Sequence, residues 1–291
     1  MADLLWSEDK ELLAFARLDF DTGTPYVQIY NPDTEASNYL ALTEAQPLDG
    51  DTRPGPFFYG WSNNAEWLSY DYFYEQVHPD SHVIYLVNVL NQENTSVMIP
   101  NPENYSWFVW SSHHTAFAIT NGETIYIGSP DIPDKLTEYR GNGFVGLIAW
   151  HPTRNEILAG SKRNAIEEGL SQLRQLNIDT GEWTDIGTFP HMAHFKFSPD
   201  GRFIAIHSQS RALENYRLEV IDASTFESIK QIELPSRLFF DLDWFDEQTV
   251  ALTTNDNVYV VPLKEPEQAY WILDDDNPLY EEFSQIIITD W

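Results

Sequence analysis

The sequence predicts an all-β fold, a β-propeller of six four-stranded blades that forms a single domain over residues 1–291. Three observations favour this fold class. Short apolar runs that end in an aromatic residue recur along the chain, each interval between them contains three further strand candidates, and turn-forming residues separate these candidates. Four antiparallel strands in a repeat of roughly 40 to 50 residues are typical of a propeller blade.

The strand-ending aromatic residue is the most regular feature of the sequence. It is followed by a polar turn, and it occurs at Trp6, Trp61, Trp110, Trp150, Phe197 and Trp244. The successive intervals are 55, 49, 40, 47 and 47 residues, and the final residue, Trp291, follows after another 47. A β-sandwich does not produce this period, so the spacing favours six blades, with a seventh blade in a longer chain as the alternative.

The fifth repeat has the clearest strand–turn–strand pattern. Phe195 and Phe197 flank Lys196 in its first strand, and the sequence Ser-Pro-Asp-Gly that follows is typical of a tight turn. The next strand, from Phe203 to His207, has the alternation expected of the second half of a β-hairpin.

We expect the same elements in the same order in the remaining repeats. Their short apolar runs are rich in aromatic and β-branched residues, which favour strands. The expected first strands are Phe57–Trp61, Tyr105–Trp110, Phe144–Trp150, His194–Phe197 and Leu238–Trp244. The strands expected beside them are Leu12–Leu18, Tyr26–Tyr30, Tyr39–Leu42, Glu66–Tyr72, Val83–Leu90, Thr95–Ile99, Thr115–Thr120, Thr124–Ile127, Lys135–Tyr139, Glu156–Ser161, Gln172–Ile178, Trp183–Ile186, Arg202–His207, Tyr216–Ile221, Ser228–Leu234, Thr249–Thr253, Val258–Pro262 and Ala269–Leu273. The blades are expected at residues 1–55, 56–104, 105–142, 143–191, 192–236 and 237–282.

Residues 283–291 have the pattern of a first strand without the three strands that should follow it. The ending Asp290-Trp291 repeats the dipeptide Asp243-Trp244. An open ring would leave strand edges exposed, so we expect this segment to close the ring by completing the N-terminal blade. The segment Met1–Trp6 competes for the same place.

The sequence Ser-Pro-Asp-Gly-Arg-Phe-Ile-Ala-Ile, which begins at Ser198, resembles the blade signature of WD40-like propellers of the TolB kind. Weaker matches begin at Trp61 and Trp150. The Gly-His and Trp-Asp dipeptides of eukaryotic-type WD40 repeats are missing, so their hydrogen-bonded tetrad is not expected. The resemblance implies a binding platform for proteins or peptides rather than an enzyme.

The composition excludes several classes of function. The chain has no cysteine, so it can form no disulfide and carries no thiolate nucleophile or thiolate metal ligand. Its formal charge of −30 disfavours nucleic acids and anionic membranes. We find neither a signal peptide nor an apolar run long enough to span a membrane, and therefore expect a cytoplasmic protein. The charge forms either a solubilising coat or a docking face for a basic partner, centred on Asp274–Asp276 and Glu281–Glu282.

No motif predicts catalysis, a metal or a cofactor. Gly141–Gly146 matches GxGxxG literally, but a strand rather than a helix follows it, so we interpret it as a loop. The closest histidine pairs, such as His113-His114, lack the three or four ligands of a zinc site. A serine nucleophile is not indicated either, because the G-x-S-x-G sequence of a nucleophile elbow is absent.

Polar residues on three first strands form one candidate site. In each first strand, the third and the first residue before the aromatic share a face because side chains alternate. These pairs are Phe58/Gly60, Trp107/Val109, Leu147/Ala149, His194/Lys196, Asp241/Asp243 and Ile288/Asp290. The polar members, His194, Lys196, Asp241, Asp243 and Asp290, are expected near the central axis. They form either a structural ion-pair network or a site for a small ligand or cation, where paired carboxylates could also serve hydrolysis.

Aromatic residues near the beginning of the first strands form a second candidate site. They are Phe57, Phe58, Tyr59, Tyr105, Trp107, Phe239 and Phe240. If exposed, Phe57, Tyr59, Tyr105, Trp107 and Phe239 would anchor a partner; the alternative is that they pack between blades. The sequence thus predicts a non-catalytic scaffold for a protein or peptide partner, possibly a basic one, with a small-ligand, cation-binding or hydrolytic site at the axis as the alternative.

Overall fold

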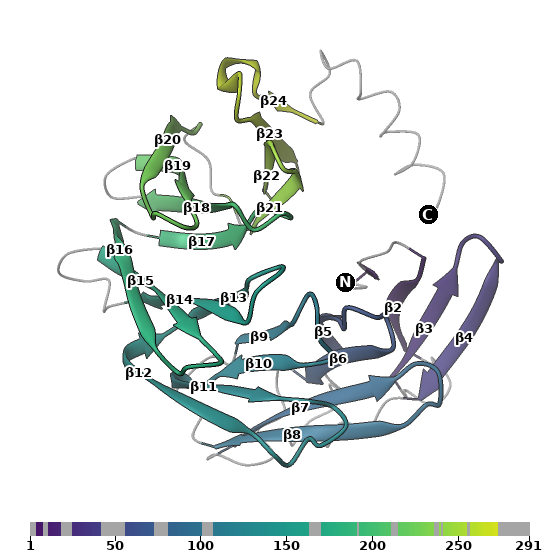
Figure 1. Ribbon diagram of the computed structural model, residues 1–291. Coiled ribbons are helices and arrows are strands. Elements are labelled where there is room, and N and C mark those ends of the chain that lie inside the picture. Colours follow the sequence, from purple (N-terminus) through teal and green to yellow (C-terminus); the bar gives the residue numbers. More distant parts are fainter. Residues whose placement is uncertain are drawn as a thin grey trace, which may run out of the picture. The chain divides into compact units, whose positions relative to one another are not determined.

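The computed structural model describes residues 4–7, 11–18, 25–41, 56–72, 81–100, 107–162, 170–190, 192–210, 215–235, 239, 241–254 and 257–272. These residues form six four-stranded antiparallel sheets, which we call blades 1 to 6 (Figure 1). The chain divides into two compact units, Met1–Trp150 and His151–Trp291, and each is described by itself.

Unit 1 contains blades 1 to 3 and the first strand of blade 4. In every blade, strands that follow one another along the chain are paired, so each blade is a meander. Blade 1 consists of β1 (Leu4–Trp6), β2 (Leu13–Leu18), β3 (Pro25–Asn31) and β4 (Ala36–Ala41); blade 2 of β5 (Pro56–Trp61), β6 (Trp67–Tyr72), β7 (Ser81–Asn88) and β8 (Asn94–Pro100); and blade 3 of β9 (Trp107–Trp110), β10 (Phe117–Thr120), β11 (Gly122–Gly128) and β12 (Thr137–Val145).

The remaining strands have the same order. Blade 4 consists of β13 (Leu147–Trp150), β14 (Glu156–Lys162), β15 (Leu170–Asn177) and β16 (Trp183–Pro190); blade 5 of β17 (Met192–Phe197), β18 (Phe203–Ser210), β19 (Asn215–Asp222) and β20 (Ser228–Glu233); and blade 6 of β21 (Asp241–Asp246), β22 (Thr249–Thr253), β23 (Val258–Pro262) and β24 (Tyr270–Trp271), with a short 3₁₀ helix, η1 (Pro266–Gln268), before its last strand.

The expected strand-ending aromatic residues end the first strands of blades 1 to 5. Leu4–Trp6 pairs with β2, so this segment, rather than residues 283–291, forms the first strand of blade 1. Residues 283–291 lie outside the described part of the chain, and ring closure by them stays a prediction.

The interpretation of Gly141–Gly146 as a loop is wrong. Gly141 and Gly143 belong to β12, which continues to Val145 and therefore passes the blade boundary expected at residue 142. Val145 is the register partner of Gly122 on β11. The register shifts between Arg140 and Val145, so the two glycines lie at an irregularity between paired positions of the same strand.

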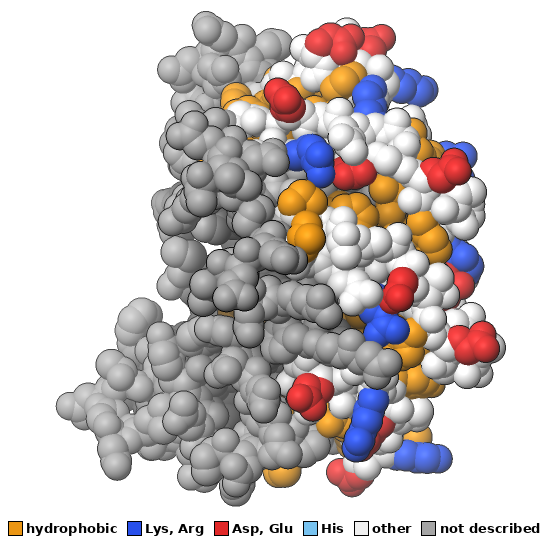
Figure 2. Space-filling view, turned by 90° about the vertical axis from the view of Figure 1, so that its left-hand side faces the viewer, with side chains coloured by type: hydrophobic (Ala, Val, Ile, Leu, Met, Phe, Trp, Pro, Cys, Tyr) orange, Lys and Arg blue, Asp and Glu red, His pale blue; other side chains and the backbone are white. Residues whose placement is uncertain are grey.

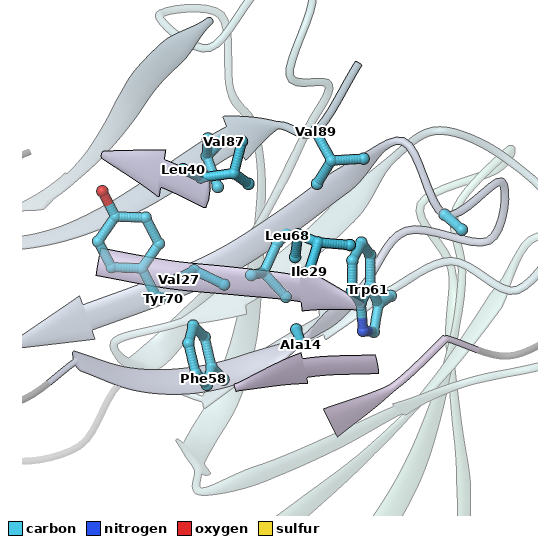
Figure 3. Packing of buried hydrophobic residues seen from close by; sticks show 11 residues of the cluster. Ala14, Val27, Ile29, Leu40, Phe58, Trp61, Leu68, Tyr70, Val87 and Val89 are labelled. Carbon is cyan, nitrogen blue, oxygen red and sulfur yellow. The ribbon is translucent and has the colours of Figure 1, made fainter. Parts of the chain in front are cut away.

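Buried side chains from neighbouring blades form the cores of each unit. Between blades 1 and 2, Val27 and Leu40 pack with Phe58, Leu68 and other apolar residues in one cluster (Figure 3). All four residues of the inner strand β10 are buried, and Phe117 and Ile119 of this strand belong to the apolar cluster between blades 2 and 3. Burial of this kind is the main stabilising contribution to the fold.

A tryptophan hydrogen bond links neighbouring blades at three equivalent places. The indole N–H of Trp61 donates to the carbonyl of Leu5, that of Trp110 to the carbonyl of Gly60, and that of Trp244 to the carbonyl of Lys196. In each case the acceptor belongs to the residue before the strand-ending aromatic of the preceding blade. The indole N–H of Trp150 is buried and has no hydrogen-bond partner among the described residues.

The turn after the strand-ending aromatic is fixed by a buried polar side chain. In blade 5, Ser198 accepts a hydrogen bond from the Phe203 amide and donates one to Asp200. Ser7 and Ser62 accept the corresponding amide hydrogen bonds in blades 1 and 2. These side chains satisfy backbone groups that the turn leaves unpaired, so the polar residue after the aromatic has a structural role.

Opposite charges are mixed on the face of the molecule that Figure 2 shows. Figure 2 shows Asp and Glu side chains beside Lys and Arg side chains, with hydrophobic side chains between them. The acidic residues 274–276 and 281–282 lie outside the described part of the chain. Among the described residues, no helix is both long enough and apolar enough to cross a membrane.

Candidate functional site

The strand register defines an equivalent residue near the beginning of each first strand, which we call the leading residue. It is the residue directly before the first buried residue that pairs with the second strand. In blade 3 this residue is Trp107, which pairs with Thr120 and precedes the buried Phe108. The leading residues are Phe57 in blade 2, Trp107 in blade 3, His194 in blade 5 and Asp241 in blade 6. Blades 2 and 3 thus present aromatic residues at this place, and blades 5 and 6 present polar residues.

The expected pair Phe58/Gly60 is wrong at its first member. The register shifts between Phe58 and Gly60, because Tyr59 is an extra residue that forms a β-bulge. This insertion reverses the alternation on its N-terminal side, so Phe58 packs in the core with blade 1 while Phe57 becomes the leading residue. Phe57 is 46% exposed.

Phe57 and Trp107 lie on neighbouring first strands of unit 1. Strands β5 and β9 are in contact, and the side chain of Trp107 is 41% exposed. The two residues therefore expose large apolar rings at equivalent levels of adjacent blades. Such rings are typical anchors in protein–protein interfaces.

Tyr59 connects this aromatic pair to the interior. Its ring lies 5.5 Å from that of Phe57 and 5.6 Å from that of Phe108. Its hydroxyl donates a hydrogen bond to the buried carboxylate of Asp71, with an O···O distance of 2.6 Å. Burial and the neighbouring Asp71 carboxylate raise the pKa of the Tyr59 phenol, so it stays protonated and keeps this donor role. The ring of Phe57 therefore contacts a tyrosine whose own position is fixed by a hydrogen bond.

Phe239, another member of the expected aromatic set, does not join this surface. Phe239 is fully buried in the core between blades 5 and 6, where it stacks on Trp271. It therefore follows the alternative of packing between blades. Tyr105 lies outside the described residues.

The expected polar residues of unit 2 lie on the neighbouring strands β17 and β21. Lys196 Nζ is 2.8 Å from Asp243 Oδ2, and the two side chains are 44% and 63% exposed. Asp241 is exposed, and its Oδ1 accepts a hydrogen bond from the next backbone amide, as that of Asp243 does. The structure thus contains a solvent-exposed ion pair and a second exposed carboxylate on the same strand as Asp243. Asp290 lies outside the described residues.

A histidine that the sequence did not indicate accompanies this group. His194 is the register partner of His207 on β18, and the two rings are stacked with centroids 5.9 Å apart and an interplanar angle of 6°. His207 is fully buried. Burial, with a smaller contribution from His194, lowers the pKa of His207 from 6.5 to about 3, so this imidazole is neutral at physiological pH.

The chemistry available to the polar residues is limited by their arrangement. No three of the described His, Asp and Glu side chains are grouped so that they could hold a metal ion. An exposed carboxylate beside a Lys–Asp ion pair could contact a small charged ligand, since its solvated oxygens are accessible.

The sequence matches no protein-family model and no curated protein. The resemblance to WD40-like and TolB-like repeats therefore stays a prediction. Solved structures match instead. Hydrazine synthase of Kuenenia stuttgartiensis is similar with a TM-score of 0.63 and 11% identity over 97% of this chain and 81% of that one. A chain from a structural and mechanistic study of two prolyl endopeptidases gives a TM-score of 0.61 and 11% identity, over 92% of this chain and 41% of that one.

Both matched structures are β-propeller proteins. Together with the six four-stranded antiparallel sheets, they show that this chain has the β-propeller fold predicted from the period of its aromatic residues. At 11% identity the likeness concerns the fold alone.

Proposed function

We propose that this chain is a non-catalytic β-propeller scaffold that binds a protein or peptide partner. The observation that carries the proposal is the exposure of two large aromatic side chains, Phe57 and Trp107, at equivalent places on adjacent first strands. An exposed aromatic ring held by a rigid strand loses little conformational entropy on binding, and such rings commonly supply much of an interface's binding energy.

The contact of Phe57 with the ordered side chain of Tyr59 favours this function. Tyr59 is fixed by its hydrogen bond to Asp71 and by its contact with Phe108, so the Phe57 ring rests on side chains that are already ordered. A preorganised surface of this kind needs little rearrangement when a partner binds.

The charge of the chain supports a basic partner. With a net charge of −30, the chain attracts cationic segments and repels acidic ones over several ångströms of solution. We therefore expect the partner to present Lys or Arg residues around an apolar or aromatic group that contacts Phe57 and Trp107.

A phage-displayed library of random peptides tests this proposal directly. We expect peptides selected on the intact protein to combine basic residues with an aromatic residue or leucine, and to bind the double variant Phe57→Ser/Trp107→Ser at least about tenfold more weakly. Phe245→Ser is the matched control, since Phe245 is 75% exposed but lies at the opposite end of its first strand. Equal binding to the wild type and the double variant would refute the proposal.

The polar residues of unit 2 support a second candidate function, the binding of a small ligand or cation, with hydrolysis as its catalytic form. The supporting observation is that Asp241 is exposed close to the accessible Lys196–Asp243 ion pair. A thermal-shift screen of metal cations and small charged metabolites against the wild type and Asp243→Asn separates the two functions. A compound that raises the Tm of the wild type but not of the variant would favour this second function.

A further inference from the structure

His207 is a buried imidazole whose polar atoms the fold does not satisfy. It is fully buried, and neither of its ring nitrogens has a hydrogen-bond partner among the described residues. In blades 2 and 3 the residues that pair with the leading residue, Asp71 and Thr120, are also buried. Asp71 accepts a hydrogen bond from the Tyr59 hydroxyl, and Thr120 accepts one from the Gly122 amide. A buried polar group without partners is uncommon and calls for an explanation.

The ring of His207 lies in the contact between blades 5 and 6, both of which belong to unit 2. On one side His194 stacks on it, and on the other the ring of Phe239 meets it edge to face at 5.5 Å and 89°. Phe239 in turn stacks on Trp271 and contacts Tyr259, so His207 touches the aromatic cluster through which blade 6 packs.

The described groups that face His207 provide no negative charge for it. On β17 the titratable groups on this side are His194 and Lys196, and the partner on β19 is Leu218, which belongs to the apolar core. Blade 6 contributes Leu242 and Trp244 to the same core, while Asp241 and Asp243 alternate with them along β21, and Asp243 is paired with Lys196. Tyr259, on β23, stays uncharged because burial raises its phenol pKa.

We infer that His207, with His194 stacked on it, makes the packing of blade 6 on blade 5 sensitive to acid: the neutral imidazole of His207 is compatible with this packing, and uptake of a proton by it loosens the two blades. A proton on His207 would place a charge in an apolar contact with no acceptor and beside a second imidazole. The inference does not depend on the proposed partner-binding function.

The direction of the effect follows from the two protonation states. The pKa of His207 is lowered in the folded protein, from 6.5 to about 3, so protons bind more tightly when the blades are apart. The stabilisation is therefore fully present above pH 6.5 and is lost progressively as the pH falls from 6.5 toward 3. Binding of this proton shifts the equilibrium between packed and opened blades toward the opened state by a factor of roughly 30 at pH 5.0, compared with neutral pH.

Hydrogen exchange followed by mass spectrometry tests this inference. After correction for intrinsic exchange rates, we expect the protection of residues 241–262 to fall roughly 30-fold between pH 7.5 and pH 5.0, relative to peptides of blade 2. His207→Leu should remove this acid response. His151→Ser is the matched control, because His151 is also buried but accepts backbone hydrogen bonds at a place where blades 1, 2 and 5 have serine, and it should keep the response.

The inference is overturned if blade 6 protection is independent of pH in the wild type, or if His207→Leu loses protection as the wild type does. Should His207→Leu fail to fold, the ring resonances of His207 in the wild type give the answer. Titration of that ring well below pH 6.5 is expected, and an ordinary titration near pH 6.5 would contradict the inference.

Discussion

Gly201 illustrates how one residue is fixed both by its backbone and by a side chain that lies over it. Its φ is +72°, a conformation that side chains with a Cβ rarely adopt, and a Cβ added there would lie 2.4 Å from Cε1 of His151. His151 also rests on Phe197, with ring centroids 4.6 Å apart. The glycine of the Ser-Pro-Asp-Gly turn is thus required by turn geometry and by the neighbouring blade together.

Replacement of Gly201 by alanine should therefore lower the free energy of unfolding by about 3 kcal/mol, through positive-φ strain and overpacking. Urea denaturation of Gly201→Ala in the wild type and in a His151→Ser background separates these causes. In the His151→Ser background the cost should fall to about 1 to 2 kcal/mol, because only the backbone strain remains. An equal cost in both backgrounds would show that the His151 ring is not responsible.

At this scale the sequence indicated some of the candidate site residues and not others. Lys196 and Asp243 form an ion pair, and Trp107, His194 and Asp241 lie near the beginning of their first strands. That the polar residues lie near the central axis stays a prediction. His207 was missed because both faces of β18 are buried between blades, so that a polar residue in this strand is not distinguished by its place in the alternation. Its lack of hydrogen-bond partners is a tertiary property that no local pattern records.

At the scale of strands, the bulges explain where sequence counting failed. An extra residue in one strand reverses the faces of all residues on one side of it, and Tyr59 does this in β5. Phe245 is a second example: the register shifts between Trp244 and Asp246, and Phe245 is 75% exposed. The period of the aromatic residues survived both insertions, which is why the number and order of strands were predictable while the face of Phe58 was not.

The tryptophan hydrogen bonds between blades give a matched pair of mutations. Trp110 donates to both the Gly60 carbonyl and the Ser69 hydroxyl at 3.0 Å, whereas the buried N–H of Trp150 has no such partner among the described residues. Trp110→Phe should therefore lower the unfolding free energy by about 1 to 2 kcal/mol more than Trp150→Phe. Equal losses in chemical denaturation would mean that these bonds contribute little to the joining of blades.

The ion pair between β17 and β21 should contribute little to stability. Because both side chains of the Lys196–Asp243 pair are substantially exposed, Asp243→Asn should change the unfolding free energy by less than about 1 kcal/mol. Thermal and urea denaturation at low salt check this expectation. A loss above about 3 kcal/mol would indicate the structural ion-pair network that the sequence allowed as an alternative.

At the scale of the whole molecule, the net charge governs both stability and association. A charge of −30 repels itself in the folded state, and added salt screens this repulsion. We expect the Tm to rise by several degrees as NaCl increases from about 0.05 to about 0.5 M. The same series in sodium sulfate at matched ionic strength separates screening from the effects of ion exclusion, and a Tm that falls with NaCl would contradict the expectation.

The same charge predicts how a partner behaves in salt. Contacts made by acidic side chains weaken when salt screens them, whereas contacts made by Phe57 and Trp107 depend on apolar burial and persist. A partner that is held by both should bind more slowly at high salt while its dissociation rate changes less. Surface plasmon resonance with a selected peptide measures both rates.

The most direct test of the scaffold function is quantitative affinity capture from a lysate of the source organism. The wild type, Phe57→Ser/Trp107→Ser and the control Phe245→Ser would be compared at low and at high salt, with the retained proteins quantified by mass spectrometry. The account predicts a stoichiometric basic partner that the wild type and the control retain and the double variant loses. Retention of the same partner by the double variant, or of none by the wild type at either salt, would contradict it.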